Sequence, residues 1–163
     1  MHRRNLLAGI AFAGVLPVVG SAMAQSGRTI ERGKMQALMG GDFATMSSEL
    51  ALKRGSSAAV RTFAKLEISE QAAVAEAFGA RPGSAGVSAR HQAMLERLQA
   101  ARGRDFDRMY IDGQIAGHKE LLTIHRRYAR SGSDPMARGA STVAVPAIET
   151  HLAMLMTMQK SVG

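Results

Sequence analysis

The chain has 163 residues, no cysteine and a formal net charge of +8. The absence of cysteine excludes disulfides, thiolate metal ligands and a cysteine nucleophile. Its 11 methionines, its many alanines and its lack of tryptophan suit close packing of helices and are unfavourable for a sheet. The basic residues are spread along the chain with few aromatic residues between them, so we expect attraction to anionic polymers and no nucleic-acid binding.

The first 24 residues are predicted to be a cleavable export signal. A basic start at Arg3 and Arg4 is followed by an apolar run. The small-residue pattern Ala22-Met23-Ala24 then places cleavage before Gln25. The paired arginines resemble a twin-arginine signal, with an ordinary secretory signal as the alternative. We therefore expect a periplasmic protein that has no transmembrane span in its mature domain, residues 25–163, and that makes peripheral contact with envelope components.

From residue 33 onward the apolar residues recur with a helical period, and the breaks fall at recognisable stop signals. The first helix is expected over residues 34–54 and is ended by Gly55. Ser56 or Ser57 can cap the second helix, which runs to Phe78. A shorter helix is expected over residues 88–99.

Two further long helices are expected over residues 104–130 and 135–159. Asp134 is a good N-cap, and the proline that follows it suits the first helical position. Pro146 lies inside the last helix and lacks an amide donor, so a kink or a short break is expected just before His151. Four long helices and one short helix, joined by brief loops, predict an all-α protein built as an antiparallel four-helix bundle.

Polar residues lie in the middle of apolar helix faces. On the helix over residues 104–130, four of them fall within about 40° of one another on a wheel of about 100° per residue. These four are Asp107, Gln114, His118 and His125. The other long helices contribute Asp42, Glu67, Gln71 and His151, with Glu70 at the margin of its face. Asp42 falls among the methionines of the first helix, which are expected to be core residues.

Buried carboxylates and imidazoles must bond to each other, hold water or hold a cation. A hydrogen-bonded His–carboxylate pair satisfies both partners without a metal and is the commoner arrangement. The alternative is a site for iron, manganese or zinc, since imidazole and carboxylate are ligands for these ions. The candidate ligands are Glu67, Glu70, Asp107, His118 and His151. The other residues expected to be buried and polar are Asp42, Gln71, Gln114 and His125.

The spacing of the candidate ligands argues against a bridged two-metal site. Such a bundle site needs a Glu-x-x-His repeat on two helices, and this chain has none. Any metal site is therefore expected to be irregular and mononuclear. No nucleophile–base pair predicts a hydrolase, because the serines, including Ser47 and Ser48, are expected near helix ends or on polar faces. A partner-binding surface is a further alternative, formed by Met154, Met156 and Met158.

The string FDRMYIDGQIAGHKELL, residues 106–122, is followed by a proline-containing helix and then by ETHLAM. This combination resembles a family of exported bacterial proteins known as domain of unknown function 4142. The resemblance covers residues 35–158 and implies a ferritin-like four-helix bundle in a periplasmic or outer-membrane protein with no established common activity. Where the family usually has Asp-His in the second helix, this chain has Glu70-Gln71, and Glu67 can supply a carboxylate on the same face.

Two functions are compatible with the residues and the resemblance. The first is an exported helical-bundle protein without demonstrated catalysis, acting in envelope stress or maintenance. The alternative is a metal-binding, oxidoreductase or storage protein that uses an irregular His/carboxylate site in the bundle core.

Overall fold

The structure is a computed structural model that describes residues 19–162, with side chains from residue 32 onward. The helices are α1 (Val19–Arg54), α2 (Ala58–Ala77), α3 (Ala89–Ala100), α4 (Gly103–Ser131) and α5 (Pro135–Val162). No strand occurs within these described residues, which confirms the predicted all-α class. In the same part of the chain, every helix is too short or too polar to cross a membrane. Most of the predicted export signal, residues 1–18, lies outside the described residues.

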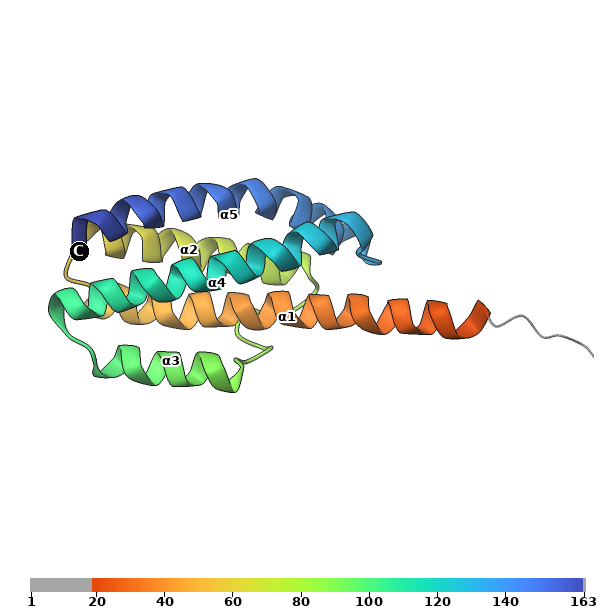
Figure 1. Cartoon of the computed structure of the whole chain (residues 1–163), viewed down its shortest axis with the longest axis horizontal. Coiled ribbons are helices and arrows are strands. Elements are labelled where there is room, and N and C mark those ends of the chain that lie inside the picture. Colours follow the sequence, from red (N-terminus) through yellow and green to blue (C-terminus); the bar gives the residue numbers. More distant parts are fainter. Residues whose placement is uncertain (1–18, 163) are drawn as a thin grey trace, which may run out of the picture.

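The four long helices form an antiparallel bundle with one long crossover. α1 and α2 are joined by a short turn and run in opposite directions (Figure 1). α4 and α5 are connected in the same way and are also antiparallel. Between these two pairs the chain returns along the bundle through α3, so that α2 and α4 run in the same direction and lie diagonally opposite. α3 packs outside the bundle against α1 and α4. A four-helix bundle with one long crossover is the ferritin-like arrangement.

The helix ends carry the capping residues that the sequence predicts. Ser57 caps α2 and Ser88 caps α3, each by accepting a hydrogen bond from the backbone amide three residues further along the chain. Asp134 accepts the same kind of bond at the start of α5, where Pro135 is the first helical residue. These side chains satisfy amides that have no partner within the helix, so the boundaries are locally encoded.

The expected start of the first helix is wrong, and the last helix has no break near Pro146, where the sequence predicts a kink or a short break. α1 is already helical at Val19, the first described residue, and not only from near residue 34. α5 continues across Pro146 without a break, although it is bowed along its length (Figure 1). The missing amide removes one backbone bond only, and packing against α4 supports the helix on both sides of the proline.

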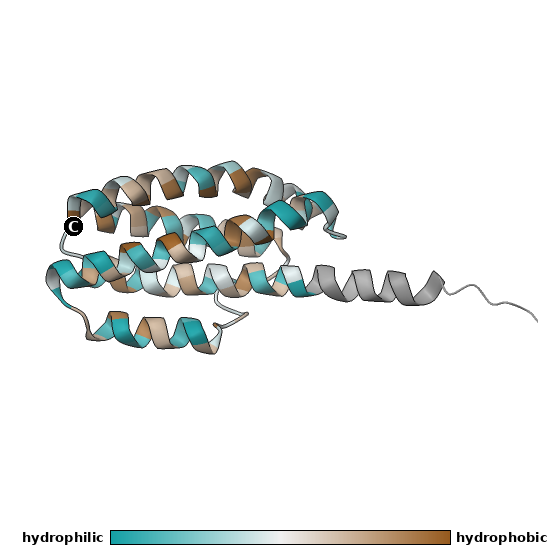
Figure 2. Cartoon of the chain, viewed as in Figure 1, coloured by the Kyte–Doolittle hydropathy of each residue, from teal (hydrophilic) through white to brown (hydrophobic). Residues whose placement is uncertain are grey.

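The core lies between the apolar faces of the long helices, which show as brown bands between teal ones in Figure 2. Its largest fully buried side chains are aromatic and branched and include Phe63, Phe106 and Tyr110. The methionines do not fill it as expected: Met35 and Met46 are 50% and 42% exposed. Rings and alanines already fill the space between the helices, so these flexible side chains lie at the margins.

Candidate metal centre

Three buried side chains from three helices meet inside the bundle: Glu67 of α2, His118 of α4 and His151 of α5. Glu67 Oε2 lies 3.3 Å from His118 Nε2 and 3.1 Å from His151 Nδ1. The two imidazole nitrogens are 3.2 Å apart. Donor atoms held about 2.1 Å from one ion, at angles between octahedral and tetrahedral, lie about 3.0–3.4 Å from each other. The triangle therefore has the dimensions of one face of a metal coordination sphere.

Each of these three side chains is oriented by a second group. Gln71 Nε2 donates to Glu67 Oε1 at 2.9 Å, which leaves Oε2 to face the two imidazoles. His118 Nδ1 lies 2.8 Å from the backbone carbonyl of Gln114, to which it donates. His151 Nε2 lies 3.1 Å from the half-buried carboxylate of Glu70. Metal-binding histidines in proteins are commonly held in this way by a carbonyl or carboxylate on the far ring nitrogen.

The Glu67 oxygen that faces the histidines has no hydrogen bond. The side chain is fully buried, and Oε2 has no hydrogen-bond partner although both imidazoles are close, because neither ring N–H is directed at it. A buried carboxylate oxygen without a donor is unfavourable, and native structures rarely leave one in that state. A cation bound between the three donor atoms would satisfy it.

Hydrogen bonding also fixes the protons of the two histidines in the absence of a metal. His118 uses its Nδ1 proton on a carbonyl, so its Nε2 accepts a proton from His151 Nδ1. His151 Nε2 lies 3.1 Å from the Glu70 carboxylate, and a second proton on this nitrogen would make His151 a cation paired with Glu70. Burial lowers the pKa of His151, but the carboxylates of Glu67 and Glu70 outweigh it and raise the pKa above its usual value. A metal at Nδ1 would replace one of these protons.

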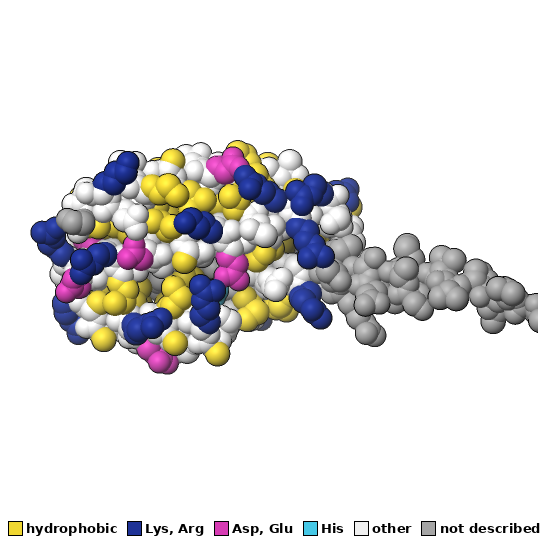
Figure 3. Space-filling model, viewed as in Figure 1, with side chains coloured by type: hydrophobic (Ala, Val, Ile, Leu, Met, Phe, Trp, Pro, Cys, Tyr) yellow, Lys and Arg dark blue, Asp and Glu magenta, His cyan; other side chains and the backbone are white. Residues whose placement is uncertain are grey.

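The carboxylate of the cluster is ionised. Burial raises the pKa of Glu67, but the neighbouring His118 and His151 outweigh this effect and bring the pKa down to about 2. The ring of Phe63 covers one side of the cluster, with its centroid 5.2 Å from that of His151 and 6.0 Å from that of His118. No histidine is visible on the molecular face drawn in Figure 3. All three side chains of the cluster are buried, so the site is largely shielded from solvent.

Two predicted acids lie away from the cluster. Both oxygens of Asp107 accept backbone amides, those of Ser56 and Ser57, at 2.8 Å each, so this candidate ligand instead fixes the turn between α1 and α2. Asp42 accepts three amides from the loop between α2 and α3 and ties it to α1. Two of those amides belong to Gly83 and Gly86, which have positive φ. A helical wheel gives the face of a residue but not its partner, so it could not separate these acids from Glu67.

Gln114 and His125 are buried as expected, but they bond elsewhere. Gln114 Nε2 donates to Ser47 at 3.0 Å and lies 3.2 Å from the Ser48 hydroxyl, which joins α4 to α1. His125 Nδ1 is bonded to the Ser141 hydroxyl at 3.1 Å. Both α1 serines are fully buried, against the expectation that they lie at helix ends or on polar faces. The helical spacing of Ser47 indicates an inward position, because Ser47 stands four residues after one apolar core residue and four before another.

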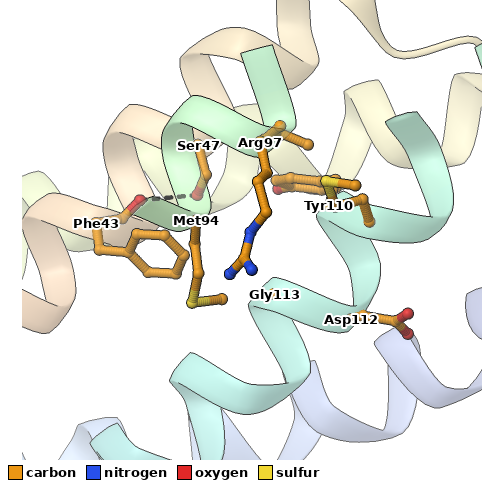
Figure 4. A pocket seen from close by; sticks show the side chains of 9 residues that line it. Phe43, Ser47, Met94, Arg97, Tyr110, Asp112 and Gly113 are labelled. Atoms are coloured by element: carbon orange, nitrogen blue, oxygen red, sulfur yellow. Dashed lines mark hydrogen bonds between the residues drawn. The ribbon is translucent and has the colours of Figure 1, made fainter. Parts of the chain in front are cut away.

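A separate cavity lies between α1, α3 and α4, with a volume of about 340 Å³ (Figure 4). The Arg97 guanidinium extends into it, while Ser47 bonds to a backbone carbonyl of α1. None of the three clustered residues lines this cavity. Its arginine is exposed, so it does not share the buried, unpaired character of the cluster.

Comparison with known proteins identifies the family of the chain. Residues 18–158 match the family described as Domain of unknown function (DUF4142). No curated protein and no solved structure matches the chain. The matched segment contains all five helices apart from the end of α5, and with them the Glu67, His118 and His151 cluster. The chain belongs to the DUF4142 family.

Proposed function

We propose that this protein is exported to the periplasm and binds one divalent transition-metal ion, iron, manganese or zinc, through Glu67, His118 and His151. The observation that carries the proposal is the triangle of converging donor atoms, in which a fully buried carboxylate oxygen has no hydrogen bond. Two imidazoles and one carboxylate form the ligand set that holds mononuclear iron(II) in oxygen-activating enzymes. Three protein ligands leave coordination positions open, which a metal needs in order to bind a further molecule.

The alternative is a polar cluster that serves only to hold the helices together. In that case the protonated His151 would have to neutralise Glu67, and the orphaned oxygen would carry a permanent energetic cost. The outer contacts favour the metal, because they hold the far atoms of Glu67, His118 and His151 and leave one nitrogen or oxygen of each side chain facing a common point. The two arrangements differ in metal content, which can be measured directly.

The test is elemental analysis of the protein purified from its native compartment. We expect about one metal ion per chain, and loss of that ion in Glu67→Ala and His118→Ala. Matched controls are His91→Ala, which removes a buried histidine outside the cluster, and Glu76→Ala, which removes an exposed acid of α2. Both should retain the metal. Glu70→Gln should weaken binding by about 10–100-fold without abolishing it, because Glu70 orients a ligand. A folded, metal-free wild-type protein would contradict the proposal.

A further inference from the structure

A second feature beside the cluster is a cavity of about 250 Å³ between α2 and α5. Its wall on α5 is a single stripe from Ala140 to His151, which spans about 16 Å at about 1.5 Å per residue. The facing wall is formed by the segment of α2 from Glu70 to Val74. Most of the lining is apolar: Ala73, Val74, Ala140, Val143, Ala144, Ala147 and Ile148. The cavity is therefore elongated and largely apolar.

The cavity exists because small side chains line the junction of two helices. α2 and α5 are neighbours, but they pack less closely than the other neighbouring long helices. Alanines at positions 140, 144 and 147 leave the space between them unfilled. Small residues alone do not call for a ligand, but a buried polar side chain of α4 also lines the cavity.

That polar group is His125, which is 2% exposed and lines the cavity. Its Nδ1 is bonded to Ser141, and its Nε2 has no partner in the described part of the chain. Burial lowers the pKa of His125 to about 4, so the imidazole is neutral at pH 7. A neutral imidazole can give or accept one hydrogen bond at Nε2, depending on its tautomer. The cavity thus offers a ligand a neutral hydrogen-bonding nitrogen on His125, and the Gln71 amide also lines it.

The other end of the cavity disfavours a negatively charged ligand. Glu70 lies there, and its carboxylate is already engaged with His151, one of the proposed metal ligands. A negative ligand would be repelled by this carboxylate, and a charged group of either sign would gain no hydrogen bond from the apolar side chains of the lining. An uncharged ligand meets neither penalty.

We propose that this cavity binds a short, uncharged, chain-like molecule, such as an aliphatic alcohol, with its hydroxyl on His125 and its chain along the alanine stripe of α5. Because the cavity reaches His151, the bound molecule lies beside the metal centre. That adjacency rests on the proposed function, whereas the binding itself does not.

The test is calorimetric titration of the metal-free, full-length protein with 1-hexanol, compared with hexanoate. We expect saturable binding of hexanol and at least about tenfold weaker binding of hexanoate, a difference of about 1.4 kcal/mol or more. His125→Phe should weaken hexanol binding by about 5–10-fold through loss of one hydrogen bond. Ala144→Leu should abolish it by filling the cavity. Ala153→Leu, the same change on another surface of α5, should have no effect.

Absence of saturable hexanol binding to the wild type would overturn the inference, and so would equal binding by wild type and Ala144→Leu. If His125→Phe does not fold, Ala144→Leu carries the test, because its side chain lies at a partly exposed position; circular dichroism checks that it is folded. The titration uses metal-free protein, so its outcome is independent of metal content. Failure of the metal proposal and failure of this one are therefore distinguishable.

Discussion

The pKa values of two buried histidines, His125 and His151, are shifted in opposite directions, according to what each one faces. His125 faces a hydroxyl and the edge of an aromatic ring, so burial keeps it neutral. His151 faces the carboxylates of Glu67 and Glu70, and these raise its pKa despite burial. Identical side chains on inward-facing positions therefore have different chemistry, and the difference comes from residues on other helices.

The neutral state of His125 predicts a specific loss of stability in acid. Its pKa in the folded protein, about 4, lies below the ordinary value of 6.5, so the folded state binds fewer protons than the unfolded state. The stabilisation is present above pH 6.5 and is lost as the pH falls toward 4. Urea unfolding at pH 7 and pH 5 should show that the wild type loses about 2 kcal/mol more than His125→Gln between these values. Equal losses would show that His125 is not neutral in the fold.

At the scale of helices, the orientation of a candidate ligand depends on the close approach of α1 to α2. Gly41 of α1 faces Gln71 of α2, and a Cβ added at Gly41 would lie 2.6 Å from Gln71 Oε1. Gln71 holds Glu67 through its other amide atom. Because Gly41 has no side chain, Gln71 can take the position in which it holds the Glu67 carboxylate in the observed orientation.

A methyl group at Gly41 should disturb the centre without touching a ligand. We expect Gly41→Ala to displace the Gln71 amide and to weaken metal binding by about tenfold, as other losses of ligand-orienting bonds do. Gly139→Ala on α5 is the matched control, because nothing lies within 4 Å of the added carbon. That control should keep wild-type affinity and gain up to about 1 kcal/mol of stability from helix propensity. Competition with a chromophoric chelator measures both affinities, and equal affinities would argue against a role for Gln71.

At the scale of the whole molecule, the candidate ligands come from three helices and from both halves of the chain. α2 belongs to the first helical pair, and α4 and α5 form the second. An ion held by all three binds the folded bundle and has no comparable site in the unfolded chain, so its binding energy becomes folding energy.

This linkage predicts that metal raises the stability of the whole bundle. Zinc at about 100 times its Kd should raise the free energy of unfolding by about 2.7 kcal/mol, measured by urea titration against a chelator-treated sample. His118→Ala should show no such gain. Magnesium serves as the control ion, because it prefers oxygen ligands and full octahedral coordination, and it should leave the wild type unchanged. A gain of equal size with magnesium, or in the variant, would mean that the stabilisation arises elsewhere.

The sequence by itself determined the helical class, most helix boundaries and the inward face of the polar residues. These follow from local causes: apolar periodicity, the capping side chains of Ser57, Ser88 and Asp134, and the prolines and glycines between helices. It did not reveal that α1 is helical from Val19 or that α5 continues through Pro146, and at Pro146 the reason is that packing against α4 sustains the helix.

Only the tertiary structure decided which inward polar groups meet. Glu67, His118 and His151 converge because α2, α4 and α5 bring them to the same height in the bundle, while Asp42 and Asp107 bond to the amides of loops. A helical wheel gives the direction of a side chain around its own axis. The position of that side chain along the bundle relative to other helices depends on turn geometry and packing, which no single helix encodes.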